Sequence, residues 1–302
     1  MVKILKKPLK DDPFVMNSEL KNLDISSNHL GETTLQPFIF QKLNKLEVLN
    51  LDSNAIPSLH AEIFAANVNL KKLFLNNNTL TTLDKTIFLT LGNLESLYLA
   101  NNAISDLNKH TFNTLPSLKM LSLSKNKLRN LHEDAFLNLD KLTHLYLQDN
   151  LLTRLPKGLL KNTPNMQFLH LDGNQISSIP SEIFTSCTLV SLGMSNNQLT
   201  RIDNSFGQCS NLMTIDLSNN QMLSVSGNSF KMARKLEFVN MKNTNKNGCR
   251  NCGIEENCCL LCSVEFQEKE TGCPKALIGS TSRSSRTQQT FHDDLIDFLE
   301  TK

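Results

Sequence analysis

The sequence predicts a solenoid of stacked coils, each of which contributes one β-strand to a continuous parallel sheet. The first observation is a repeated unit that opens with a large apolar residue at positions 20, 46, 70, 94, 118, 142, 166, 189, 212 and 236. The period is 24 residues, with one interval of 26 and two of 23, and a fixed period of this length is typical of repeat architectures. Two further observations are an alternation of apolar side chains within each unit and an asparagine at a constant place behind it.

The segment from Leu94 to Phe112 shows the unit in a regular form, L-x-x-L-x-L-x-x-N-x-I-x-x-L followed by Phe. Leu97 and Leu99 alternate with polar or small residues, which is the period of a strand with one buried face. Asn102 ends the strand, and its amide can bond backbone groups that the turning chain would leave unpaired. The same place holds an asparagine ladder, namely Asn28, Asn54, Asn78, Asn126, Asn150, Asn174, Asn197 and Asn220.

These units resemble the leucine-rich-repeat family, specifically its 24-residue type in extracellular receptors and secreted proteins, with the pattern L-x-x-L-x-L-x-x-N-x-L-x-x-L-x-x-x-x-F-x-x-L. The resemblance covers about residues 14–244 in ten tandem copies. It implies an α/β leucine-rich-repeat solenoid, a horseshoe with a parallel sheet of about ten strands on its concave face and short 3₁₀ or irregular segments on its convex face. The chain is similar in style to Toll-type receptor ectodomains and insect leucine-rich immune proteins.

Residues 1–19 are interpreted as a truncated or degenerate first repeat. Phe14 lies six residues before Leu20, the same interval that separates Phe64 from Leu70, so the chain begins in the middle of a unit. We expect an incomplete first repeat, and a self-capping first coil is the alternative. These residues contain no apolar stretch long enough for a signal peptide.

The solenoid of ten repeats is expected to span residues 20–248, with a cysteine-rich C-terminal cap at residues 249–274. Crowded cysteines in a short segment indicate disulfides, whose pairing the sequence leaves open. A Cys₄ zinc site formed by the two C-x-x-C pairs is the alternative. The cap cysteines are Cys249, Cys252, Cys258, Cys259, Cys262 and Cys273.

Two short segments follow the cap. Residues 275–289 are rich in Ser, Thr and Arg and predict a disordered linker. Residues 290–302 predict a short amphipathic helix, because four apolar side chains form one stripe opposite acidic ones. The adjacent Cys258 and Cys259 are similar to the double-cysteine motif of insect leucine-rich immune proteins, which pair through a coiled coil, so a dimer through the C-terminal segment is one expected assembly.

Two further cysteines lie within the solenoid, Cys187 three residues after Phe184 and Cys209 three residues after Phe206. The position faces the core, and neighbouring coils stack closely enough for a disulfide. Because both Cβ vectors should point into the core in parallel, we expect two buried thiols rather than a bond.

Composition limits the possible function classes. A net charge of +2 with both signs interspersed argues against a nucleic-acid-binding groove, and the chain has no run of about 18 apolar residues that could span a membrane. The motifs of hydrolases, metalloproteases and phosphate-binding loops are absent. We therefore expect no enzyme, and neither a catalytic residue, a metal site nor a cofactor.

Strand register predicts which side chains face outward from the sheet, because successive residues point to opposite faces. Both tyrosines of the chain fall there, together with phenylalanines, a methionine and histidines, and such a gathering of aromatic residues marks an interaction surface. The rim beside them is polar and mildly acidic, which favours a protein partner. The predicted partner-binding residues are Phe74, Tyr98, Met120, His144, Tyr146, Phe168, His170 and Asp172.

We interpret the chain as a non-catalytic recognition module that binds a protein ligand or co-receptor on its concave face. The resemblance places it outside the cell, as a secreted protein or part of a receptor in innate immunity or receptor signalling. There Asn77, in the sequon Asn77-Asn78-Thr79, would be glycosylated. An extracellular-matrix or adhesion protein and an intracellular leucine-rich-repeat adaptor are the alternatives.

Overall fold

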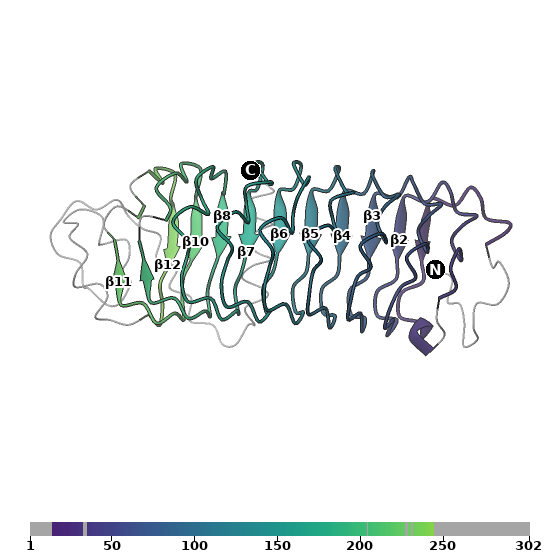
Figure 1. Ribbon diagram of the computed structural model, residues 1–302, viewed down its shortest axis with the longest axis horizontal. Coiled ribbons are helices and arrows are strands. Elements are labelled where there is room, and N and C mark those ends of the chain that lie inside the picture. The colour runs from purple at the N-terminus through teal and green to yellow at the C-terminus, as the bar shows by residue number, and fades with distance from the viewer. Residues whose placement is uncertain (1–13, 33–34, 204, 227–228, 231, 245–302) are drawn as a thin grey trace. The chain divides into compact units, whose positions relative to one another are not determined.

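The computed structural model describes residues 14–32, 35–203, 205–226, 229–230 and 232–244. Ten short parallel strands form one sheet in the order β1-β2-β3-β4-β5-β6-β7-β8-β10-β12, so the strand of each coil pairs with that of the next (Figure 1). These strands are β1 (Asn22–Asp24), β2 (Val48–Asn50), β3 (Lys72–Phe74), β4 (Ser96–Tyr98), β5 (Met120–Ser122), β6 (His144–Tyr146), β7 (Phe168–His170), β8 (Ser191–Gly193), β10 (Thr214–Asp216) and β12 (Phe238–Asn240).

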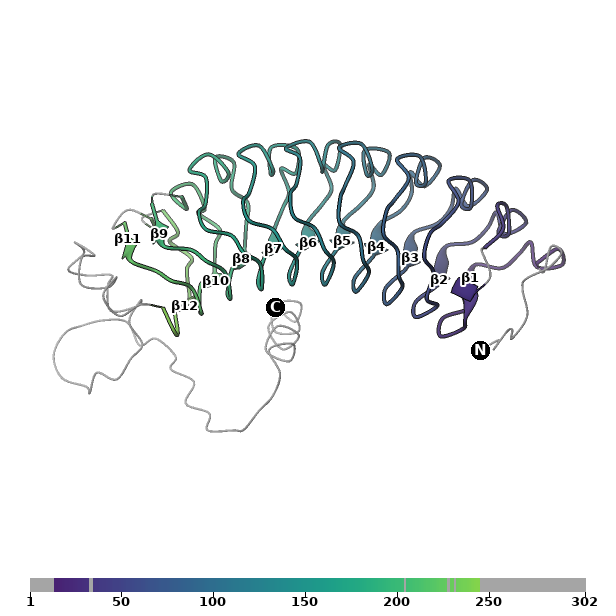
Figure 2. The same ribbon diagram turned by 60° about the horizontal axis from the view of Figure 1, so that its bottom comes forward.

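The coils of residues 14–244 follow an arc, with the strands on its inner side and the turns on its outer side (Figure 2). The middle residue of each strand points away from the inner surface into the core. Leu73, Leu97 and Leu121 pair with one another in register and are fully buried. The predicted solenoid, the sheet of about ten strands and the inward positions are confirmed.

The side chains of the asparagine ladder form hydrogen bonds that connect each coil to the preceding one. The Nδ2 atom of Asn102 donates to the carbonyl oxygen of Leu99 in its own coil at 3.1 Å and to that of Leu75 in the preceding coil at 2.9 Å, while its Oδ1 atom accepts from the backbone N–H of Leu80 at 3.0 Å. The amide is buried. Because the turn leaves these backbone groups without a strand partner, the side chain satisfies groups that would be costly to bury unpaired.

The residue before the ladder asparagine has a left-handed backbone in most coils, with φ of 54° at Asn77, 53° at Asn101 and 53° at Lys125. Asparagine tolerates this region better than most residues, which explains the repeated Asn-Asn pairs. Gly173 holds the position at φ 65°, where a Cβ atom would collide with the carboxylate of Asp149. The sequon at Asn77 is thus also a product of turn geometry.

Over the described residues, the segments between the strands of the main sheet are mainly turns, and they include one 3₁₀ helix, η1 (Leu30–Glu32), and a second sheet of two short parallel strands, β9 (Arg201–Ile202) and β11 (Ser224–Val225). Beneath the turns the phenylalanines of successive coils stack on one another. The stacked sets are Phe14, Phe40 and Phe64, then Phe88 and Phe112, and finally Phe184, Phe206 and Phe230.

The prediction of two free thiols inside the solenoid is wrong. Cys187 and Cys209 form a disulfide, with an S–S distance of 2.03 Å and a Cα–Cα distance of 4.8 Å. Only one residue separates Cys187 from Leu189, whereas two separate Leu91 from Leu94, so the coil lacks a residue at this point. Cys187 is only partly buried, unlike Cys209, because the shorter segment displaces it from the core register and turns it toward its neighbour.

Several predictions fall outside the described residues. They concern residues 1–13, the six cap cysteines of residues 249–274, the linker at 275–289 and the helix at 290–302, together with the dimer expected from that region. Over the part of the chain that the structure describes, no helix has the length and apolarity needed to cross a bilayer.

Candidate functional site

The predicted partner-binding residues come together on the concave face of five neighbouring strands, β3 to β7. The first and third residues of each strand point outward. Strand pairing aligns the first residues of neighbouring strands in one row and the third residues in a second row. Six of the eight predicted residues are half-buried and contribute ring or thioether surface to this face, which we call the aromatic surface. It consists of Phe74, Tyr98, Met120, His144, Tyr146 and Phe168.

The rings of the aromatic surface stack across neighbouring strands. The ring centroids of Phe74 and Tyr98 are 4.5 Å apart with an interplanar angle of 3°, and those of His144 and Phe168 are 4.4 Å apart. The ring of Tyr146 lies 5.3 Å from that of His170. Aromatic pairs across a ladder hold each other in one orientation, so the relative orientation of these rings is fixed.

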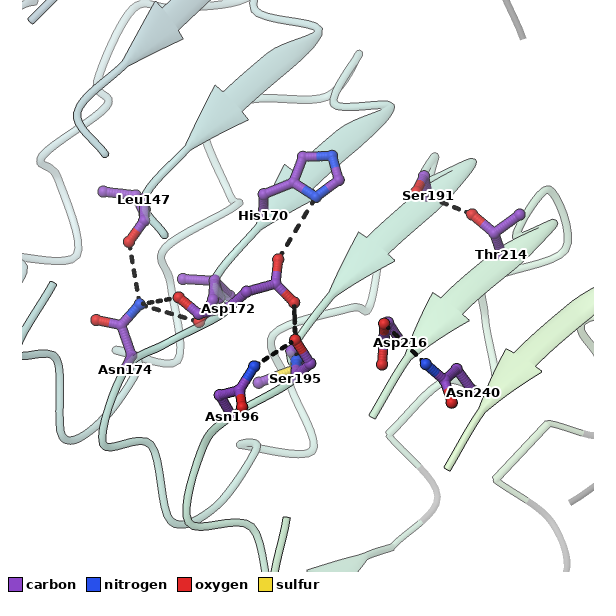
Figure 3. A network of polar contacts seen from close by, with 12 residues as sticks. Leu147, His170, Asp172, Asn174, Ser191, Ser195, Asn196, Thr214, Asp216 and Asn240 are labelled. Atoms are coloured by element: carbon purple, nitrogen blue, oxygen red, sulfur yellow. Dashed lines mark hydrogen bonds and ion pairs between the residues drawn. The ribbon is translucent and has the colours of Figure 1, made fainter. Parts of the chain in front are cut away.

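His170 differs from its prediction, because its side chain is only 2% exposed. Strand register places it on the concave face as predicted, but the ring of Tyr146 covers one side and the carboxylate of Asp172 lies against Nδ1 at 3.7 Å (Figure 3). On the neighbouring strand, Gly193 has no side chain and leaves space for both residues. A Cβ atom at this position would collide with Asp172 Oδ2 and crowd His170 Nδ1. His170 is therefore buried beside the aromatic surface, whereas Asp172 remains 19% exposed at the rim.

The polar groups of this network do not form a catalytic arrangement. Asp172 Oδ1 accepts from both the backbone N–H of Ser195 at 2.8 Å and its hydroxyl at 2.9 Å, so the carboxylate lies between the serine and His170 (Figure 3). A nucleophilic serine needs its hydroxyl bonded to the base, with the carboxylate behind that base. Here the carboxylate lies between the serine and the histidine, and its bonds to Ser195 hold the turn that follows β8.

His144 lies on the strand next to that of His170. Burial lowers the pKa of His144, and the nearby His170 lowers it further. Thr143 Oγ1 lies 2.8 Å from His144 Nδ1. Among the described residues, no group of three or more His, Cys, Asp or Glu side chains is placed to hold a metal ion.

The two rims of the concave face carry different charge. Along the rim where the strands begin, lysines and glutamates of successive coils pair, with Glu47 at 3.2 Å from Lys21 and 2.7 Å from Lys71, and Lys119 at 2.9 Å from Glu95. These exposed pairs leave the rim close to neutral. Sequence analysis missed these pairs, although their spacing of one repeat, 24 residues in two pairs and 26 in the pair of Lys21 with Glu47, is visible in the sequence.

The opposite rim, where the strands end, is acidic. Burial raises the pKa of Asp52, of Asp149 and of Asp216. Asp172 adds to the increase at both Asp149 and Asp216, since like charges disfavour ionisation. Because negative charge is unfavourable here, a cation from a partner would be favoured.

Replacing Asp216 with asparagine should stabilise the fold at pH 7. The folded pKa is raised above the unfolded value near 3.8, so the favourable contribution of this carboxyl is present below that value and is lost as pH rises through the folded pKa. Asparagine avoids the loss and keeps an oxygen for the N–H of Ser218, which bonds Asp216 Oδ1 at 2.9 Å.

Urea denaturation at pH 7 and pH 3.5 measures the effect. The gain of Asp216→Asn should shrink at the lower pH, and Asp106→Asn at an exposed position should change little at either. A gain that persists unchanged at pH 3.5 would contradict an origin in ionisation.

A cavity of about 110 Å³ opens on the outer side of the solenoid. It lies where Leu160 takes the place that phenylalanine holds in most coils. Its lining includes Met166, Ile183 and Cys187, so it borders both the interruption of the phenylalanine stack and the disulfide.

The chain matches the family model described as Leucine rich repeat over residues 18–80, 68–128, 116–176 and 187–246. No curated protein matches the chain in sequence.

Similar solved structures include Toll in the Toll–Spatzle complex of Drosophila, at 24% identity and a TM-score of 0.64, where the match covers 77% of this chain and 34% of that one. The TLR13–ssRNA13 complex matches at 26% identity and a TM-score of 0.65, over 77% of this chain and 38% of that one. The Leptospira interrogans LRR protein LIC12759 matches at 28% identity and a TM-score of 0.59, over 76% and 62%. This chain thus spans between about one third and three fifths of the length of these proteins.

Proposed function

Because this chain belongs to the leucine-rich-repeat family, we propose that it is a non-catalytic recognition module that binds a protein partner on the concave face of β3 to β7. The observation that carries the proposal is the aromatic surface, whose rings are stacked in fixed orientations yet half-exposed. Aromatic residues held in this way dominate the binding energy of protein interfaces. Their rigidity lowers the entropy lost on binding.

The acidic rim supports a protein partner over a nucleic acid. The solved relatives include both classes, since Toll is in complex with Spatzle and TLR13 with ssRNA13. A polyanion would meet Asp52, Asp149, Asp172 and Asp216 along one edge of the face, and carboxylates repel phosphate. A ligand or co-receptor with basic side chains complements this edge.

We propose that the protein acts outside the cell, in receptor signalling or innate immunity. The disulfide between Cys187 and Cys209 supports this, because such bonds persist in oxidising compartments and are rare in the cytosol. Asn77 is exposed and would be accessible for glycosylation there. Counting reactive thiols in the native protein tests the compartment, because an intracellular adaptor would present both cysteines reduced.

Replacing Tyr98, Tyr146 or Phe168 individually with alanine should weaken partner binding by more than about 1 kcal/mol at two or more of the three positions. The stacked rings supply contact area that alanine removes, while the strand core beneath remains. The protein captured by the wild-type chain from extracellular fluid serves as the partner, and titration calorimetry measures its affinity for each variant.

Lys109→Ala on the outer side is the matched control and should leave the affinity within about twofold. Unfolding midpoints of all variants must stay close to that of the wild type. A hydrogen-exchange footprint of the partner on the outer turns instead of β3 to β7 would refute the proposed face.

A further inference from the structure

The cavity on the outer side of the solenoid lies between two successive segments, residues 157–166 and 182–189, which lead into β7 and β8. Two irregularities of the repeat meet there. Leu160 stands where neighbouring coils carry a buried phenylalanine, and the segment after Cys187 is one residue short. Both side chains remain only partly buried, and the two coils leave space between them.

The inner wall of the cavity is apolar. Its side chains are those of Leu160, Met166, Ile183, Cys187 and Leu189. Three of them, Met166, Ile183 and Leu189, are at most 3% exposed. The thioether of Met166 and the disulfide of Cys187 place two sulfur-bearing side chains on this wall. Because sulfur makes favourable contacts with aromatic rings, the wall favours a ring over an aliphatic group.

The hydroxyl groups that also line the interior form hydrogen bonds within the protein. Thr163 Oγ1 donates to the carbonyl oxygen of Leu160 at 3.2 Å, and Thr188 Oγ1 donates to that of Met166 at 2.8 Å. In the described part of the chain, no side chain lining the cavity has a buried polar atom without a hydrogen-bond partner. Since a water molecule needs two to four polar partners, an apolar group suits this interior better than water.

The volume of the cavity corresponds to one small ring. An engineered apolar cavity of about 150 Å³ holds a benzene molecule. The cavity found here measures about 110 Å³ and is bordered by exposed side chains on its outer side. A single ring can therefore occupy it while a substituent of that ring reaches the mouth.

The mouth of the cavity carries a net positive charge. Lys157, Lys161 and Glu182 line it and are exposed. Lys157 Nζ lies 3.0 Å from Glu182 Oε1, whereas Lys161 forms no ion pair with any described residue. The pair of Lys157 and Glu182 is neutral as a unit, so the charge of Lys161 favours an anionic substituent.

We propose that this cavity is a binding site for a small carboxylate that carries one aromatic ring. The ring lies against Met166, Ile183 and Cys187, and the carboxylate reaches Lys161 at the mouth. The site lies on the outer side of the solenoid, whereas the aromatic surface lies on the concave face. It is therefore a function additional to recognition of a partner protein.

Phenylacetate is the probe that tests this site. The full chain, labelled with ¹³C in its methionine and isoleucine methyl groups, is titrated with phenylacetate and followed by NMR. The resonances of Met166 and Ile183 should shift together, because a bound ring alters the magnetic field at nearby methyl groups. The variants Met166→Leu and Ile183→Val identify the two resonances.

Three related molecules define the ligand class by competition with phenylacetate. Phenylacetamide, which keeps the ring but has no charge, should bind about two- to fivefold more weakly, in line with the contribution of an exposed ion pair. The aliphatic carboxylate 4-methylpentanoate should bind at least about twofold more weakly, because it lacks the sulfur–ring contacts. Acetate has no apolar group and should not compete.

Matched variants locate the site. Leu160→Phe introduces the residue of most other coils, fills the cavity with a ring of the protein itself and should abolish the shifts. Leu89→Phe adds the same ring at an exposed outer position and should preserve them. Lys161→Gln should weaken phenylacetate binding about two- to fivefold, whereas Lys109→Gln, at another exposed outer position, should leave it unchanged.

An absence of shifts at Met166 and Ile183 in saturating phenylacetate would overturn the site, and so would shifts that persist in a folded Leu160→Phe variant. If that variant does not fold, the comparison of Lys161→Gln with Lys109→Gln remains, and equal affinities in these two variants would overturn the position of the carboxylate. Phenylacetamide that binds as tightly as phenylacetate would overturn the anionic class. The same result with 4-methylpentanoate would overturn the aromatic class.

Discussion

Asn126→Ala is expected to lower the free energy of unfolding by about 3–5 kcal/mol. The buried Nδ2 atom of Asn126 donates to the carbonyl oxygens of Leu99 at 2.9 Å and Leu123 at 3.1 Å, and its Oδ1 atom accepts from the N–H of Ile104 at 3.0 Å. Each buried backbone group left unpaired costs about 1–3 kcal/mol. Because Asn126 is buried, water cannot readily replace all of these bonds.

Urea denaturation followed by far-UV circular dichroism measures the loss. Asn165→Ala is the matched control, because exposed Asn165 also donates from its amide to a carbonyl of the preceding coil, Asp140, at 2.8 Å. Water can take over that bond, so the control should change stability by less than about 1 kcal/mol. Similar losses of unfolding free energy at both positions would mean that burial does not account for the contribution of the asparagine ladder to stability.

Local rules acting within one repeat predict most of the fold. Period-two alternation identifies Leu97 and Leu121 as core residues, because neighbouring coils repeat the same register. The asparagine ladder follows from the need to pair the backbone where each strand ends. Register also places Tyr98, Tyr146 and Phe168 on one face, so the location of the candidate site follows from the same argument.

Departures from the repeat are harder to predict. The disulfide between Cys187 and Cys209 depends on how one missing residue reorients a short segment, whereas the sequence argument assumed an undisturbed coil. The burial of His170 depends on three neighbours at once: the ring of Tyr146, the carboxylate of Asp172 and the space left by Gly193. Periodicity predicts the direction of a side chain, but what covers it is decided by the residues of adjacent coils.

The central coil offers the most direct test of the inward positions. Leu121→Ala is expected to lower the free energy of unfolding by about 2–5 kcal/mol. Leu121 is the middle residue of β5, fully buried and paired in register with Leu97 and Leu145. Because coils on both sides hold the backbone of β5 at a fixed spacing, the core cannot close over the missing side chain, and a cavity remains.

Leu89→Ala is the matched control, since the same atoms are removed from a side chain that is 62% exposed on the outer side. It should change stability by less than about 0.5 kcal/mol. Urea denaturation with hydrogen exchange on the amides of β4 to β6 would show both the size of the loss and its position, because in a solenoid each coil is stabilised mainly by its immediate neighbours. Protection lost equally in the two variants would mean that the burial of Leu121 does not account for its contribution to the stability of the central coils.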